Sequence, residues 1–326
     1  MKRKFCLMCT FVLLFGFVGS TAASVWWTGA GGDNYWSNPG NWGPDDGDGF
    51  GYYVADTAGS TILVDATHSA TAGTGARIGY NNGIGGNPVT VNITGGSLTS
   101  GETRLAYYAG GACVINVSGT GQFINTTYIR SSYSTTLTNS TVSISDDGYI
   151  SVGTYWRHSE KGQGHITIED NGLLEIVDYL DLADSSGDGY LNIYDNGKLV
   201  VGGLFDVGAK VGSASGTTTV NLHDGTIQAG SLDMVGLVPG DYAGLIDIEL
   251  GELLLKGDLR SDTTLLGWIS SDYIVGYAGT GSVVVGTSLV DIGGVDYTLI
   301  TAIPEPATVM LLGLGGLALI RRKRAR

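Results

Sequence analysis

The chain has 326 residues, of which 54 are glycine, only six are proline and 15% are charged. Its formal net charge of −14 disfavours a nucleic-acid partner, because phosphate binding needs a basic surface. No long window shows helical periodicity. Short alternating apolar segments separated by glycine-containing turns instead predict an all-β protein.

The N-terminus has the pattern of a secretory signal peptide. Three basic residues precede a largely apolar segment and then a run of small residues. We therefore expect a Sec-type signal over residues 1–23, cleaved after Ala22 or Ala23. The mature chain would keep a single cysteine, Cys113, and could not form an internal disulfide.

Residues 24–60 are predicted to form an N-terminal cap rich in tryptophan. Four of the six tryptophans fall within 17 residues, at Trp26, Trp27, Trp36 and Trp42. Exposed indole rings at these positions would suit stacking on sugars. The favoured interpretation is a hydrophobic plug that closes the first coil of a repeat structure, which every such stack requires.

Residues 61–244 form a repeat array. A short alternating strand recurs seven times, and the steps between successive copies are 24, 27, 24, 25, 29 and 26 residues. The copies close at Ile93, Val117, Ile144, Ile168, Ile193, Leu222 and Ile248. A polar turn and two further short apolar segments follow each copy, which gives three strands in about 25 residues.

Three strands per repeat predict a right-handed parallel β-helix of about seven to eight coils, each burying its apolar face against the next. Coils stacked about 4.8 Å apart would make seven of them a rod on the order of 30 Å long. Thr61–Val64 together with Arg77–Tyr80 is interpreted as an incomplete earlier coil. A β-sandwich is the alternative, but its turns do not repeat one chemistry at a fixed period.

The turns after the first strands carry the main candidates for acid chemistry. Asp146, Asp170, Asp195 and Asp224 are assigned to one turn position, so stacking would align their carboxylates in a ladder. Paired carboxylates are what glycoside hydrolases use. Because aspartate recurs wherever the repeat needs an Asx turn of positive φ, we interpret the ladder as structural.

A calcium loop is the second candidate site. Asp184, Asp188 and Asp195 fall at positions 1, 5 and 12 of an EF-hand-like loop. Position 12 is Asp rather than Glu, and a predicted strand, Leu191–Ile193, crosses the loop. Weak Ca²⁺ binding is left open, and no other cofactor is expected.

Enzymatic motifs are otherwise missing from the sequence. None of the four histidines lies in an HExxH motif, and no GxSxG or P-loop motif occurs. No set of residues is singled out for nucleophilic catalysis. We therefore expect no enzymatic activity, with a polysaccharide lyase or hydrolase as the less favoured alternative.

Residues 245–302 are predicted to form a C-terminal β cap, and residues 303–326 are predicted to be a sorting tail. Pro304, Glu305 and Pro306 precede fourteen uncharged residues, which as a helix span about 21 Å against a hydrocarbon core of about 30 Å. A basic cluster follows and would stay on the cytoplasmic side. Its residues are Arg321, Arg322, Lys323, Arg324 and Arg326.

This short apolar segment favours a temporary membrane stop over an ordinary C-terminal anchor, and the two prolines keep the tripeptide extended and accessible. Removing both ends of the chain leaves nine Lys and Arg against 31 Asp and Glu, a charge near −22. An acidic, soluble surface suits a protein outside the cell.

The tail, from Ile303 to Arg326, resembles the PEP-CTERM domain of bacterial surface proteins. The resemblance implies processing by an exosortase-type membrane enzyme, transient association with the inner membrane, and a final location at the cell surface or outside the cell. The repeats between residues 89 and 236 resemble those shared by autotransporter passengers and PEP-CTERM proteins. The closest copy is residues 187–197.

Three functions are compatible with this sequence. The leading hypothesis is a non-enzymatic structural protein of the cell surface or extracellular matrix, associated with biofilm or exopolysaccharide. The second is a β-helix that binds or degrades carbohydrate, with an extracellular polysaccharide as partner. Ice binding is the third, because some ice-binding proteins have the same kind of tail, but threonines here do not continue as a ladder.

Overall fold

A computed structural model describes most of the predicted mature chain. The described residues are 25–43, 52–80, 87–134, 138–183, 187–208, 216–234 and 244–305. The predicted signal peptide with its cleavage site at Ala22 or Ala23 lies outside them, as do Pro306 and everything after it.

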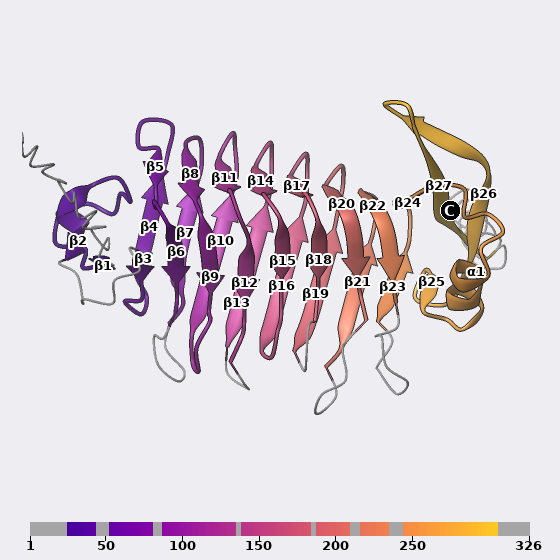
Figure 1. Cartoon of the computed structure of the whole chain (residues 1–326), viewed down its shortest axis with the longest axis horizontal. Helices are drawn as coiled ribbons and strands as arrows, with labels where there is room; N and C mark the ends of the chain where they lie inside the picture. The colour runs from indigo at the N-terminus through magenta and orange to yellow at the C-terminus, as the bar shows by residue number, and fades with distance from the viewer. Residues whose placement is uncertain are drawn as a thin grey trace, which may run out of the picture.

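The described chain forms a parallel β-solenoid, seen as an elongated rod in Figure 1. Its coils stack from β4 (Thr61–Val64) to β24 (Glu252–Lys256), about eight in all among the described residues. The β-solenoid that the repeat predicts is therefore confirmed. Each full coil contributes one strand to each of three faces, named A, B and C here in chain order.

Face A carries the first strand of every coil. These strands are β4, β7 (Val89–Ile93), β10 (Ala112–Val117), β13 (Asn139–Ile144), β16 (Gln163–Ile168), β19 (Asp188–Ile193), β21 (Thr218–Leu222) and β23 (Leu245–Ile248). A shorter strand, β25 (Ile274–Gly276), pairs with β23 in parallel at the C-terminal end.

Face B carries the second strands. They are β5 (Ala70–Thr71), β8 (Ser97–Ser100), β11 (Gln122–Asn125), β14 (Tyr149–Val152), β17 (Leu173–Ile176), the first parts of β20 (Lys198–Asp206) and β22 (Thr226–Asp233), and β24. β20 and β22 continue round the corner, so their second parts belong to face C.

Face C carries the third strands and extends furthest toward the N-terminus. They are β1 (Val25–Trp27), β3 (Tyr52–Ala55), β6 (Gly75–Ile78), β9 (Glu102–Leu105), β12 (Ile129–Ser131), β15 (Tyr155–Arg157) and β18 (Tyr179–Asp181). The coil that begins at Thr61, expected to be incomplete, has all three strands, because β5 supplies the second one.

The core is a stack of aliphatic side chains running along the rod. Alternation in each strand turns every second residue inward, as the period of a β-strand requires. The seven residues that close the repeated strands are all 0% exposed. Burial of this continuous stack is what each coil lacks when isolated, and it explains why the apolar residues recur with the repeat.

Each Asx-Gly turn needs one residue with positive φ and one residue without a side chain, and these are two different residues. Positive φ belongs to the aspartates, with values of 55° at Asp146, 56° at Asp170 and 54° at Asp195. The following glycine is needed for space, since a Cβ on Gly172 would lie 2.6 Å from the carbonyl oxygen of Ile144 in the preceding coil. Asp224 does not adopt positive φ, so it is not equivalent to the other three.

The N-terminal end is closed by tryptophans. Trp27 and Trp36 are 5% and 2% exposed, and both rings lie against Trp42, with centroids 5.1 and 4.9 Å apart. Asp33 accepts from the Nδ2 atoms of Asn38 and Asn41 at 2.9 and 2.8 Å, which fixes the loop around these rings. This loop contains the 3₁₀ turn η1 (Pro39–Asn41) and leads into β2 (Trp42–Gly43). Trp27 and Trp36 are buried, as a hydrophobic plug requires, while Trp42 is half-buried.

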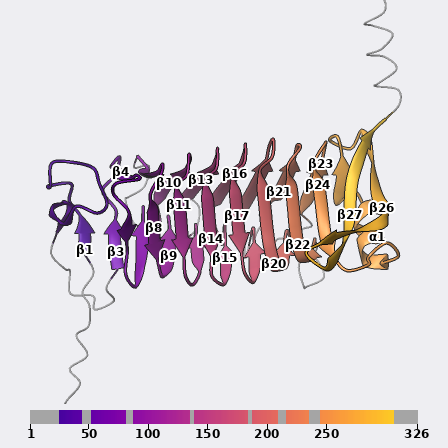
Figure 2. The ribbon, with the colours of Figure 1, turned by 90° about the horizontal axis from the view of Figure 1, so that it is seen from above.

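The C-terminal end is closed by a hairpin and one short helix (Figure 2). β23 and β24, which the sequence analysis places in the cap, still pair in parallel with the preceding coil. The pairing changes from parallel to antiparallel at β27 (Val295–Pro304). This strand pairs with β24 on one side and with β26 (Gly281–Ile292) on the other. The helix α1 (Thr263–Ser270) packs Leu265 into the core. Antiparallel pairing ends the stack and protects its edge.

Candidate functional site

Four arginines form a ladder on face C. Arg77 on β6 is in register with Arg104 on β9, which is in register with Arg130 on β12 and then Arg157 on β15. Their chain neighbours on these strands are buried, so the half-buried arginines lie on the outer side, about 4.8 Å apart from coil to coil. We call these four residues the arginine ladder.

The residue at this register changes from arginine to aspartate after the fourth coil. Arg157 is followed by Asp181 on β18, then by Asp206 on β20 and Asp233 on β22. The arginine ladder therefore has a defined length within face C, with aspartates next in line.

Two tyrosine stacks flank the arginine ladder. On one side Tyr107 stacks between Tyr80 and Tyr133, with ring centroids 5.8 and 4.5 Å apart. On the other side Tyr128, Tyr155 and Tyr179 stack at 4.9 and 4.8 Å, with planes within 4° of parallel. Neighbouring coils hold equivalent residues in register, so one tyrosine per coil produces a continuous stack.

The guanidinium groups lie over these rings. Arg77 and Arg104 each lie 4.7 Å from a ring centroid, that of Tyr80 and that of Tyr107 respectively. Arg130 is 5.0 Å from Tyr133, and the ammonium of Lys161 is also 5.0 Å from this ring. Ring quadrupoles attract these cations, which offsets part of the repulsion between like charges stacked on consecutive strands.

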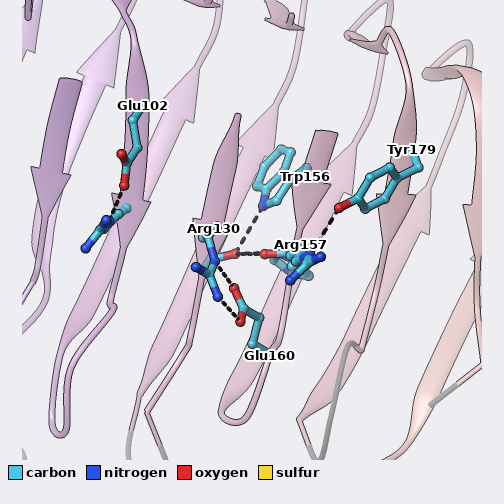
Figure 3. Close-up of polar contacts among 9 residues, drawn as sticks. Glu102, Arg130, Trp156, Arg157, Glu160 and Tyr179 are labelled. Carbon is cyan, nitrogen blue, oxygen red and sulfur yellow. Dashed lines mark hydrogen bonds and ion pairs between the residues drawn. The ribbon is translucent and has the colours of Figure 1, made fainter. Parts of the chain in front are cut away.

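Two glutamates pair with the arginine ladder (Figure 3). Arg130 donates from Nε and Nη2 to the carboxylate of Glu160 at 2.5 and 2.6 Å, and the side chain of Glu160 is only 3% exposed. Arg104 donates to Glu102, which also accepts from the hydroxyl of Tyr52 at 2.8 Å. Arg157 donates from Nε to the hydroxyl of Tyr179 at 3.1 Å.

The pKa shifts of Arg130 and Glu102 both favour the charged forms of these side chains. The hydrogen bond to Glu160 is the main cause that raises the pKa of Arg130 above its usual value. Burial alone would raise the pKa of Glu102, but hydrogen bonds from Tyr128, Tyr52 and Arg104 outweigh it and hold this pKa below its usual value. Burial and the contact with Glu102 raise the pKa of Tyr128. Near neutral pH the arrangement therefore suits electrostatic binding better than proton transfer.

A buried histidine supports the segment that carries Glu160. His158 is 0% exposed, and its Nδ1 lies 3.2 Å from the hydroxyl of Ser131, to which the indole of Trp156 donates at 3.1 Å. The backbone N–H of Glu160 donates to the carbonyl of Ser131 at 3.2 Å. Burial lowers the pKa of His158 to about 3, so the ring is neutral at physiological pH.

The aspartate carboxylates in these turns accept hydrogen bonds from the backbone of neighbouring turns. The carboxylate of Asp146 accepts from the backbone N–H of Gly119 in the preceding coil at 3.1 Å. The carboxylate of Asp170 accepts in the same way from the N–H of Asp146 at 3.3 Å. These side chains therefore tie each turn to the one before it, as the structural interpretation expects.

Substitutions at Asp170 test this interpretation. Asp170→Asn keeps the left-handed backbone tendency and an acceptor oxygen, so we expect a change in the free energy of unfolding below about 0.5 kcal/mol. Asp170→Val places a β-branched residue at positive φ and removes the acceptor, which we expect to cost about 2–3 kcal/mol. Denaturant titration measures both values. Turnover of an acidic polysaccharide that Asp170→Asn abolishes would instead assign this residue to catalysis.

The candidate calcium ligands do not converge. Asp184 lies outside the described residues. Asp188 begins β19 and Asp195 follows its end, so the strand separates the two carboxylates by on the order of 15–20 Å. Asp188 accepts from the backbone and hydroxyl of Thr217, both at 2.9 Å. Among the described residues, no three His, Cys, Asp or Glu side chains form a metal-binding group.

The first residues of the predicted sorting tail leave the rod without a spacer. Pro304 is the last residue of β27 and pairs with Gly281 of β26, and Glu305 directly after it is exposed. The rest of the tail, including Pro306 and the basic residues Arg321, Arg322, Lys323 and Arg324, lies outside the described residues.

Comparison with known protein families decides the nature of this tail. Residues 302–324 match the family model described as the PEP-CTERM protein-sorting motif. The chain ends in a PEP-CTERM sorting signal. The PEP-CTERM signal implies an exported protein that passes through the membrane, is processed by an exosortase-type enzyme and ends at the cell surface.

The remaining comparisons add no relative of the rod. No curated protein and no solved structure matches the chain. Within the part of the chain that the structure describes, no helix has the length and apolar character needed to cross a membrane.

Proposed function

We propose that the processed protein is a non-enzymatic structural component of the extracellular matrix at the cell surface. The observation that carries the proposal is how polar side chains are used along the rod. Aspartates, asparagines and tyrosines form ladders between neighbouring coils, as in the 2.8 Å contact of Asn116 Nδ2 with Asn92 Oδ1 and the stacked tyrosines of face C. Such ladders stiffen a rod and leave few of these groups to converge on a substrate.

The acidic character of the released body supports the same role. Nine Lys and Arg remain against 31 Asp and Glu once both ends are removed. Net charge of this size keeps the rods apart and soluble among extracellular polymers. The PEP-CTERM signal supports this role, because it implies an exported protein that ends at the cell surface.

Deletion of one whole coil tests whether the rod acts as a scaffold. Ile166 pairs with Leu191, so removing residues 166–190 joins His165 to Leu191 in the register that β13 and β16 had. Repeat stability is a sum of coils and interfaces, so we expect a folded protein whose Tm falls by only about 2–4 °C. The amount of protein retained in the extracellular matrix of a deletion strain complemented with this variant should equal that of the full chain.

A half-coil deletion is the matched control. Removing residues 166–177 shifts the following strands onto other faces, so this variant should not fold and should be lost from the matrix. Loss of matrix retention in the folded whole-coil variant would mean that one specific coil carries the function, and the scaffold proposal would then fail.

A further inference from the structure

We propose that the outer edge of β26 is a self-association surface, through which two released rods join end to end by antiparallel pairing of their β26 strands. β26 is the outermost strand at the C-terminal end of the rod in both views (Figure 1, Figure 2). The inference goes beyond the proposed structural role and does not depend on it.

The outer side of β26 has no strand beside it over nearly its whole length. Its inner side pairs with β27 from one end of the strand to the other. Apart from the single pair that β25 makes at Gly281, no further strand of the described chain pairs with β26. In an antiparallel sheet alternate backbone N–H and C=O groups point away from the neighbouring strand. Near the middle, the carbonyl of Thr287 accepts from Nη1 of Arg260 at 2.7 Å, and the stretches on either side are open to a further strand.

This edge has few of the features that keep edge strands from pairing with another chain. Edge strands in soluble proteins are commonly short, or they carry lysine, proline or a bulge. β26 has twelve residues without lysine or proline, and its one charged residue, Asp291, lies near its end. A register shift between Val285 and Leu289 is its one such feature. Most of the strand can therefore pair.

The distribution of charge favours this end for contact between two copies. Residues 263–290 contain a single charged residue, Asp272, although 15% of the chain is charged. The released body as a whole has nine Lys and Arg against 31 Asp and Glu, so two copies repel one another through most of their surface. Of the five large apolar side chains exposed among the described residues, Leu250, Leu266 and Ile303 lie at this end. Contact here buries apolar surface and brings few like charges together.

The sequence of β26 suits pairing with itself. An antiparallel pair related by a two-fold axis places the first half of one strand against the second half of the other. The first half contains three consecutive valines at residues 283–285, and the second half contains Leu289 and Val290. Apolar residues therefore meet apolar residues across the axis, and such cross-strand pairs stabilise a sheet.

Pairing at this edge continues the rod. β24, β27 and β26 follow one another outward from the last coil, in the direction in which the coils stack (Figure 1). A second β26 strand extends the same sheet and carries its own rod on the far side, so the dimer has about twice the length of one rod. The sorting tail starts beside this edge, because Pro304 pairs with Gly281, the first residue of β26. We therefore expect the dimer in the released form.

Sedimentation equilibrium and small-angle X-ray scattering of the released protein test the inference. We expect a monomer–dimer equilibrium with a Kd in the micromolar range, because one strand from each copy buries less surface than a standard interface. The maximum dimension should rise about twofold as the dimer forms. Added salt should strengthen the dimer, because it screens the repulsion between two acidic bodies.

Two matched substitutions of exposed serines locate the contact. Ser288→Lys places a like charge on both copies near the middle of the edge, and we expect it to raise the Kd by about tenfold or more. Ser231→Lys adds the same charge on β22, so it changes the overall repulsion equally and should dimerise like the unchanged protein. Circular dichroism and Tm identify any variant that is misfolded.

Cross-linking tests the same contact without adding charge. Cys113 is the only cysteine of the released body and is buried, so a cysteine introduced at Ser288 or Ser231 is the reactive thiol. A short bismaleimide should join Ser288→Cys into a covalent dimer and leave Ser231→Cys monomeric.

Several results would overturn the inference. They are a monomer at all concentrations up to about 100 μM, equal effects of the Ser231 and Ser288 variants, and a dimer no longer than one rod. A Ser288→Lys protein that stays monomeric but keeps its matrix retention would uphold this surface and leave the scaffold role independent of it. Loss of retention in the whole-coil deletion with dimerisation intact would remove only the scaffold role.

Discussion

Replacing Pro304, Glu305 and Pro306 together by alanine is expected to keep the whole chain in the membrane fraction. The PEP-CTERM match covers this tripeptide and the tail behind it, and the released form requires that the two be separated. Cells that contain the processing enzyme should accumulate a protein larger than the released form by the mass of the tail. Fractionation followed by immunoblotting with an antibody against the rod measures both location and size.

The effect should be close to complete because Pro-Glu-Pro occurs only once in the sequence. Pro304 ends β27 and is paired with Gly281, so the chain before the motif is a paired strand rather than a flexible linker. Pro88, an exposed proline before β7, provides the matched control, and Pro88→Ala should be released normally. Normal release of the triple variant would mean that processing depends on the apolar and basic parts of the tail alone.

The repeat was the part of the fold most open to prediction from sequence. Ile144, Ile168 and Ile193 recur because one inward position per coil must fill the same slot of the core, and all three are buried in the structure. The first coil was harder to recognise, because its second strand, β5, is only two residues long. The helix α1 was missed as well. Its eight residues are too few for a periodic pattern, and its start depends on Asp262 accepting from the N–H groups of Thr264 and Leu265 at 2.9 Å.

The arginine ladder was missed because the repeat was aligned on its first strand. Arg77, Arg104, Arg130 and Arg157 lie on the third strands, where most other positions differ from coil to coil. Their spacing of 26 or 27 residues is a signal that alignment on the third strand would have revealed. The pairing of Arg130 with Glu160 had no such signal, since the loop that brings Glu160 to Arg130 belongs to one coil only.

The geometry of the aspartate turns was only partly predictable from the sequence. Their recurrence predicted a structural role, and Asp146 and Asp170 do bind the backbone of the preceding coil. Which residue of each turn takes positive φ depends on contacts between coils. Gly172 is held where a side chain would strike the coil before it, and the left-handed conformation is found at Asp170.

Mild acid is expected to destabilise the rod through His158. The folded pKa of this histidine is about 3, against about 6.5 for a solvated histidine, because burial disfavours its charged form. The unfolded chain therefore binds one more proton than the folded chain between these values. Its contribution to stability is complete above pH 6.5 and is lost as the pH falls toward 3. The free energy of unfolding should drop by about 1 kcal/mol from pH 6.5 to 5.5, and by about 1.4 kcal/mol over the next unit.

A variant without the titrating ring isolates this contribution. His158→Gln keeps a polar group near Ser131 but binds no proton, so its stability should change less with pH even if its absolute stability is lower. His165 is the matched control because burial also lowers its pKa, while its ring is only stacked on Tyr190 at 4.7 Å and is half-buried. We expect His165→Gln to reduce the pH dependence of the free energy of unfolding less than His158→Gln does. Denaturant titrations between pH 7.5 and 5, above the range in which most carboxylates titrate, measure the slopes. Identical slopes for His158→Gln and the unchanged protein would show that His158 gains access to water before the rod unfolds, and the segment that holds Glu160 against Arg130 would then open in mild acid by itself.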